Sequence, residues 1–146
     1  MDSNGNGVLD AGEINQPQTK YVCNGSPATI NLTGTYVGIQ STFTDQSPSG
    51  PSASSETVTF ILTQSGTTIS GSFSSASGTT GTISGTTNGN MFSYSVVITK
   101  SSPGCTSGSG YGLGALQNNV ITLTGPIKTV CSGITYYSIY SGSGSK

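Results

Sequence analysis

The side chains best suited to metal binding lie at the start of the chain. Three of its five acidic residues fall within residues 2–13, in the stretch DSNGNGVLDAGE, although charged residues make up only 6% of the whole sequence. Carboxylates, amide side chains and a backbone carbonyl alternate here at short intervals, and a hard cation such as Ca²⁺ needs six to eight oxygen ligands. The expected ligands are Asp2, Asn4, Asn6, Val8, Asp10 and Glu13.

The spacing of this stretch resembles the EF-hand-like calcium loops of dockerins and of many secreted bacterial proteins. Gly7 stands where the backbone of such a loop turns sharply, and Leu9 stands at its apolar anchor. The resemblance covers residues 2–13 and implies calcium as a structural cofactor. Flanking helices are not expected, since only Met1 precedes Asp2 and Pro17 would interrupt a helix after the loop. We therefore expect weak affinity, with a Kd of about 10⁻⁴–10⁻³ M. The alternative is a loop whose acids are simply solvated.

Outside this loop the sequence offers little for catalysis. It has no His, which excludes Ser-His-Asp and Cys-His mechanisms. Asp45 and Glu56 are its remaining acids, and both flank one long connection between the first two expected strands. A glycosidase would need such a pair about 5–10 Å apart across a substrate, whereas we expect these two to lie outside any cavity. The chain is therefore not expected to be an enzyme.

The charge balance limits the classes of partner. The formal net charge is −1, and nucleic-acid binding requires clustered Lys and Arg, so no nucleic-acid partner is expected. No apolar stretch approaches the ~20 residues that a membrane-spanning helix needs. Strands rich in Thr, Ser and Gly with almost no charge are typical of secreted or cell-surface bacterial proteins, and we expect this localisation.

From residue 28 onward, apolar residues alternate with Thr and Ser at the period of a β-strand. Turn sequences such as NGN at 88–90 separate the strands, and no helical period interrupts them. The expected strands are 28–43, 56–63, 67–73, 81–87, 91–99, 111–116, 120–125 and 134–140.

Short connections between successive strands require antiparallel neighbours. The fold class predicted is all-β, an eight-stranded antiparallel up-and-down β-barrel, with a β-sandwich as the alternative. Residues 1–27 would form an irregular arm that holds the calcium loop, residues 28–141 the barrel domain, and residues 142–146 a flexible tail.

The stretch LTGTYVG at 32–38 resembles the first strand of lipocalin-like and avidin-like barrels. In those families a glycine two residues before an aromatic residue lets the aromatic ring close the barrel floor, and Gly34 and Tyr36 match that pair. The resemblance implies a ligand-binding barrel. The alternative is a core packed solid by side chains. The residues expected to line a ligand cavity are Tyr36, Phe60, Phe73, Tyr94, Tyr111 and Tyr136.

Three cysteines remain to be placed. In an up-and-down barrel, Cys105 and Cys131 follow strands that end on the same side, so we predict a disulfide between them. The alternative is three free thiols. Cys23 precedes the first strand at the opposite end, where it would stay free or join another chain.

Two functions fit these features. The first is a secreted binding module for a small apolar or glycan ligand. The second is a self-associating structural subunit of an extracellular fibre or surface assembly, in which low charge favours contact between strand edges and Cys23 links neighbours.

Overall fold

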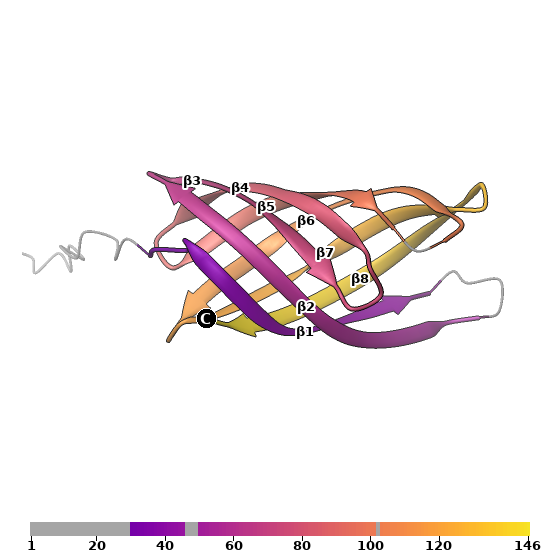
Figure 1. The fold of residues 1–146 in the computed structure, drawn as a ribbon, viewed down its shortest axis with the longest axis horizontal. Coiled ribbons are helices and arrows are strands. Elements are labelled where there is room, and N and C mark those ends of the chain that lie inside the picture. Colours follow the sequence, from indigo (N-terminus) through magenta and orange to yellow (C-terminus); the bar gives the residue numbers. More distant parts are fainter. Residues whose placement is uncertain (1–29, 46–49, 102) are drawn as a thin grey trace, which may run out of the picture.

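The computed structural model describes residues 30–45, 50–101 and 103–146, which form an antiparallel barrel of eight strands (Figure 1). The strands follow one another along the chain, joined by short turns or loops. They are β1 (Gly34–Thr44), β2 (Ser52–Ser65), β3 (Thr68–Ser75), β4 (Thr80–Asn88), β5 (Met91–Lys100), β6 (Cys105–Gln117), β7 (Val120–Cys131) and β8 (Ile134–Ser145).

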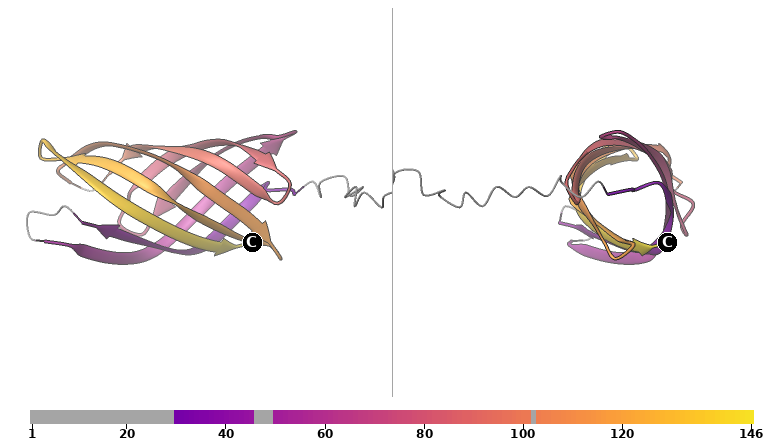
Figure 2. Two further views of the ribbon diagram at one scale, coloured as in Figure 1. Left: turned by 180° about the vertical axis from the view of Figure 1, so that it is seen from behind. Right: turned by 90° about the vertical axis from the view of Figure 1, so that its left-hand side faces the viewer.

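The barrel is closed by pairing between its first and last strands. Each strand pairs with its neighbour in the chain, and β1 also pairs with β8, from Val37 opposite Ser145 to Thr44 opposite Ser138. The end-on view in Figure 2 shows the resulting ring. The predicted up-and-down barrel is therefore confirmed, and the alternative β-sandwich is wrong because the sheet has no second layer and returns to its own first strand.

The strands form where apolar residues alternate with hydroxyl residues, because successive side chains of a strand point to opposite faces. The predicted turn at 88–90 is present, with Gly89 at a φ of 63°. Asn118 and Asn119 turn the chain from β6 to β7 at φ values of 52° and 64°. Asparagine tolerates this left-handed region better than most residues, which suits it to a two-residue hairpin.

One end of the barrel is filled by residues just before β1 and at its start. Leu32 and Tyr36 are fully buried, and the Tyr36 hydroxyl donates to the Leu32 carbonyl at 3.2 Å. The Leu32 amide donates to the Gln64 side chain at 2.9 Å. In the end-on panel of Figure 2 the segment ahead of β1 crosses the ring. The end that carries the β2–β3, β4–β5 and β6–β7 turns is therefore closed.

The C-terminal residues depart from the expectation of a flexible tail at 142–146. Residues 142–145 belong to β8 and pair with both β1 and β7. Lys146 follows them, and its ammonium donates to the carbonyls of Asn31 and Thr33 at 3.3 and 3.0 Å. The Gly–Ser composition suggested a linker, but Gly142 and Gly144 occupy inward positions at the strand period, and pairing on both sides orders the segment.

Three segments outside the predicted strands are also strand. β2 begins at Ser52, β6 begins at Cys105 and β7 continues to Cys131, so all three extend further toward the open end than predicted. The first strand instead begins at Gly34, later than the predicted residue 28. None of the residues that the structure describes forms a helix long and apolar enough to cross a membrane.

A candidate ligand pocket inside the barrel

The middle of the interior is hollow on one side because four successive inward positions of β6 carry no side chain. They are Gly108, Gly110, Gly112 and Gly114, whereas Leu116 of the same strand packs against the core. A Cβ atom at Gly112 would collide with the Tyr94 hydroxyl, and one at Gly114 would collide with the Phe92 ring. The Phe92 and Tyr94 rings of β5 therefore lie over these glycines, which leaves the middle of the barrel unfilled.

A cavity of about 220 Å³ lies in this space and opens at the end that carries the β1–β2, β3–β4, β5–β6 and β7–β8 connections. Thr79, which precedes β4, lines the cavity from a turn. The other lining residues stand at inward positions of the strands. The residues that line it are Gln40, Thr42, Thr44, Glu56, Phe60, Phe73, Thr79, Ile83, Tyr94, Val96, Ile98, Leu123, Ile127, Thr129, Ser138 and Tyr140.

The depth of the pocket is apolar and aromatic, with one pair of hydroxyl groups. Phe60 and Phe73 are paired residues of β2 and β3. The Tyr140 hydroxyl donates to the Tyr94 hydroxyl, and the two rings meet edge to face with centroids 6.3 Å apart. Because it accepts from Tyr140, the Tyr94 hydroxyl keeps its own proton available as a donor.

Burial governs the ionisation of this tyrosine pair. It raises the pKa of Tyr94 to about 12, although the hydrogen bond from Tyr140 acts in the opposite direction. Burial, reinforced by the hydrogen bond to Tyr94 and by repulsion from a Tyr94 phenolate, raises the pKa of Tyr140 well above its usual range. Both hydroxyls are therefore neutral under physiological conditions and act as hydrogen-bonding groups.

The mouth of the pocket is polar. Gln40 and Glu56 face each other across β1 and β2, and the Gln40 amide donates to one Glu56 carboxylate oxygen at 3.1 Å. The Ser77 backbone amide donates to the other oxygen at 2.9 Å. Partial burial raises the pKa of Glu56, but the hydrogen bonds from Ser77, Ser75 and Gln40 together lower it more, so the net shift is downward and the carboxylate is ionised at neutral pH. On the adjacent pair of strands, β1 and β8, the hydroxyls of Thr44 and Ser138 are 2.6 Å apart.

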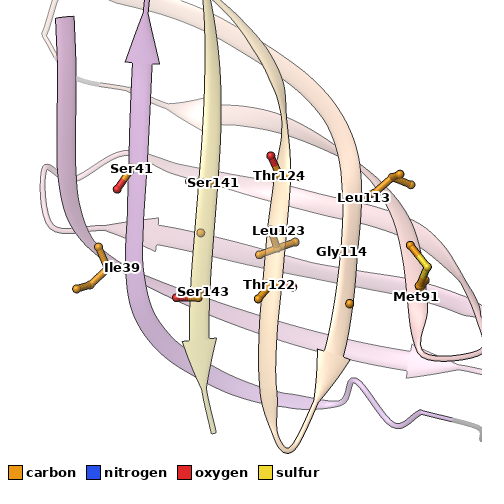
Figure 3. Close-up of a pocket in the computed structure, with 12 residues that line it drawn as sticks. Ile39, Ser41, Met91, Leu113, Gly114, Thr122, Leu123, Thr124, Ser141 and Ser143 are labelled. Atoms are coloured by element: carbon orange, nitrogen blue, oxygen red, sulfur yellow. The ribbon is translucent and has the colours of Figure 1, made fainter.

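A second hollow, of about 650 Å³, lies on the outer wall of the barrel over β6, β7, β8 and β1 (Figure 3). Short side chains such as Ser141 and Thr122 form its base, and Ile39, Leu113 and Met91 rise around it. It is larger than the interior pocket but open to solvent, and no aromatic ring lines it. Ligand sites usually enclose their ligand and converge a few polar groups on it, so the interior pocket is the better candidate.

The predicted cavity residues divide into three groups. Phe60, Phe73 and Tyr94 line the interior pocket, as predicted. Tyr36 is buried at the closed end instead, and Tyr136 is half-buried on the inward side of β8 without lining the pocket. The prediction for Tyr111 is wrong: it is 69% exposed, because it stands between inward-facing Gly110 and Gly112 and so points outward.

Several residues of the pocket were not anticipated. Glu56 was expected to lie outside any cavity, but it lines the pocket from β2, where it stands two residues before inward-facing Val58 and shares its face. Tyr140 lies on the inward face of β8 together with Ser138. In both cases the period-2 alternation carried the signal, since Glu56 continues the series Val58, Phe60 and Leu62. The glycine alternation at 108–114 likewise indicates a strand face that lacks side chains.

The predicted disulfide between Cys105 and Cys131 is present and links the first residue of β6 to the last residue of β7 at the open end. The expected calcium ligands at residues 2–13, and Cys23, lie outside the described residues. Within residues 30–45, 50–101 and 103–146, no three His, Cys, Asp or Glu side chains gather in a group that would hold a metal ion.

The sequence matches no protein-family model and no curated protein. Among solved structures, the chain is similar to a mutant of the vaccine antigen transferrin binding protein B from Actinobacillus pleuropneumoniae, with 13% sequence identity and a TM-score of 0.49. That similarity covers 82% of this chain and 65% of the other, so this chain spans less than two thirds of that protein's length.

Proposed function

We propose that this chain is a non-catalytic, secreted or cell-surface bacterial binding module whose barrel takes one small, mainly apolar molecule. The observation that carries the proposal is a barrel closed at one end by Leu32 and Tyr36 and hollow at the other, where aromatic walls converge on neutral hydroxyl groups. An engineered 150 Å³ cavity is large enough for benzene, so 220 Å³ suits a ligand of one ring with a short substituent.

Two further features support an extracellular location. The Cys105–Cys131 disulfide is stable in oxidising compartments and is uncommon in the bacterial cytosol. The very low charge content is the second feature. In this proposal, calcium held by residues 2–13 has a structural role and takes no part in ligand binding.

The proposal is tested by blocking the pocket from neighbouring positions of β1. Thr42 faces inward and lines the pocket, whereas Ser41 faces outward and lines the outer hollow. We expect Thr42→Phe to abolish the binding of benzyl alcohol, measured by NMR titration of the full chain, and Ser41→Phe to leave it unchanged. Loss of binding in Ser41→Phe alone would place the site on the outer wall and overturn the proposal.

A second candidate, self-association, is favoured by an apolar row on the outer wall. Pro126, Ile139, Phe43 and Ala53 are successive cross-strand neighbours on β7, β8, β1 and β2. Ile139 is 61% exposed and Phe43 is 48% exposed. Assembly would then use this row and not strand edges, since the eight described strands close on themselves. Light scattering after gel filtration tests it: assemblies that Ile139→Lys dissolves support this candidate, and a monomer at all concentrations excludes it.

A further inference from the structure

The formal charge on the described lining of the interior pocket is negative. Among the described residues that line it, Glu56 is the only charged one. Hydrogen bonds from Gln40 and Ser77 hold its carboxylate at the mouth. The carboxylate accepts hydrogen bonds from the Gln40 amide and the Ser77 backbone amide at 3.1 and 2.9 Å, and the hydroxyls of Ser75 and Ser77 also lie close to it. All of these donors are neutral, so the carboxylate keeps its full negative charge and attracts a cation at the mouth.

The walls below the carboxylate also favour positive charge. Four aromatic rings, those of Phe60, Phe73, Tyr94 and Tyr140, line the pocket. The face of an aromatic ring carries partial negative charge and attracts ammonium groups. An anionic ligand would be repelled by the Glu56 carboxylate and by the ring faces. No Lys among the described lining residues would compensate for this repulsion.

We infer that the ligand is a small organic monocation, a primary amine on an apolar body of about one ring, whose ammonium group binds the Glu56 carboxylate while its body lies among the aromatic rings. This inference rests on the proposed binding function and specifies the chemical class of the ligand. The ammonium group offers three donors, and the hydroxyls of Thr44 and Ser138 line the same pocket as the carboxylate. The cavity volume limits the body to a single ring.

The experiment compares three probes of nearly equal size: benzylamine, benzyl alcohol and benzoate. Each is titrated at neutral pH into the full chain, and the resonances of Tyr94, Tyr140 and their neighbours are followed by NMR. We expect benzylamine to bind about 10-fold more tightly than benzyl alcohol, since a hydrogen bond between its ammonium group and the ionised carboxylate is stronger than one between neutral groups, and benzoate to bind most weakly.

The matched variants are Glu56→Gln and Asp45→Asn, which remove the same charge from inside and outside the pocket. Asp45 follows β1, is exposed and does not line the pocket. We expect Glu56→Gln to weaken benzylamine about 10-fold and to change benzyl alcohol less than twofold, so that the alcohol also reports an intact fold. Asp45→Asn should change neither affinity by more than twofold.

The possible outcomes distinguish a wrong ligand class from a wrong binding function. Equal affinities for benzylamine and benzyl alcohol in the wild type, or an amine preference that survives Glu56→Gln, would overturn the inferred ligand class while the pocket keeps its binding role. If none of the three probes shifts the pocket resonances, the proposed binding function itself fails, and the inference fails with it.

Discussion

At the scale of single residues, the hydroxyl pair of Tyr94 and Tyr140 sets the chemistry of the pocket floor. A buried hydroxyl is costly unless it is hydrogen-bonded, and each tyrosine supplies a partner for the other. Because Tyr94 accepts from Tyr140, its own proton remains available as a donor at the floor. The mouth is charged where the floor is neutral, because hydrogen-bond donors from β1 and from the β3–β4 turn keep Glu56 ionised.

The raised pKa values of the tyrosine pair predict a loss of stability at high pH. Below pH 10, the usual tyrosine pKa, both residues are protonated in the folded and unfolded chains. Between pH 10 and about 12 the unfolded chain loses these protons while the folded chain keeps them, so the free energy of unfolding should fall by about 1.4 kcal/mol per pH unit for each tyrosine. Denaturant titrations from pH 9 to 12 measure this. In Tyr94→Phe the slope should be shallower, and an equal slope would contradict the assignment.

The calcium loop gives a second prediction at this scale. Because Asp2, Asp10 and Glu13 supply the expected carboxylates, calcium should bind with a Kd of about 10⁻⁴–10⁻³ M by calorimetry. Glu13→Gln should weaken binding at least 10-fold, since the bidentate ligand at the last loop position is lost, and Asp45→Asn serves as the control. No heat of binding at 10 mM calcium, beyond the dilution control, would show that the loop is an ordinary solvated segment.

At the scale of elements, β6 determines whether the barrel is hollow or filled. Its four inward glycines let the side chains of β5 lean across it, and the disulfide fixes its first residue to the end of β7. A strand with side chains at these positions would fill the interior, as in many small barrels. The interior pocket therefore depends on the residues of one strand.

Adding one methyl group to that strand should be destabilising. In Gly112→Ala the new Cβ would meet the Thr124 carbonyl and the Tyr94 hydroxyl, and overpacking of this kind typically costs about 1–3 kcal/mol. Thermal unfolding measures the change. Ser109→Ala, at an outward position of the same strand, is the control and should be nearly neutral. A neutral Gly112→Ala would show that β6 can shift outward and that the interior is not tightly constrained.

At the scale of the whole molecule, closure depends on the last residues of the chain. Residues 142–145 of β8 pair with β1 on one side and β7 on the other, and Lys146 anchors the segment that plugs the closed end. The ring therefore has no free edge among the eight described strands, and edge-to-edge assembly loses its template.

Removing residues 142–146 should therefore destabilise the whole barrel. The deletion opens the β1–β8 seam next to Val37 and exposes backbone groups of β7, and at about 1 kcal/mol for each lost hydrogen bond the free energy of unfolding should fall by at least about 2 kcal/mol. Chemical denaturation measures the loss. The double substitution Ser143→Ala and Ser145→Ala keeps the backbone pairing and is the control. A deletion that costs no stability would contradict the role assigned to the seam.

The sequence by itself determined the class of the fold, the order of the strands and the disulfide. Alternating apolar residues and Asn- or Gly-containing turns are local, and a series of hairpins allows few arrangements. It also identified Phe60, Phe73 and Tyr94 as pocket residues. Only the tertiary structure decided where the interior is empty and what charge faces it. Whether Tyr111 points in or out, and whether Glu56 lies at a mouth or on a loop, depends on where each strand begins and on its register with neighbours. Strand boundaries in Gly- and Ser-rich stretches are fixed by pairing with distant residues, and the local sequence of those stretches resembles a linker.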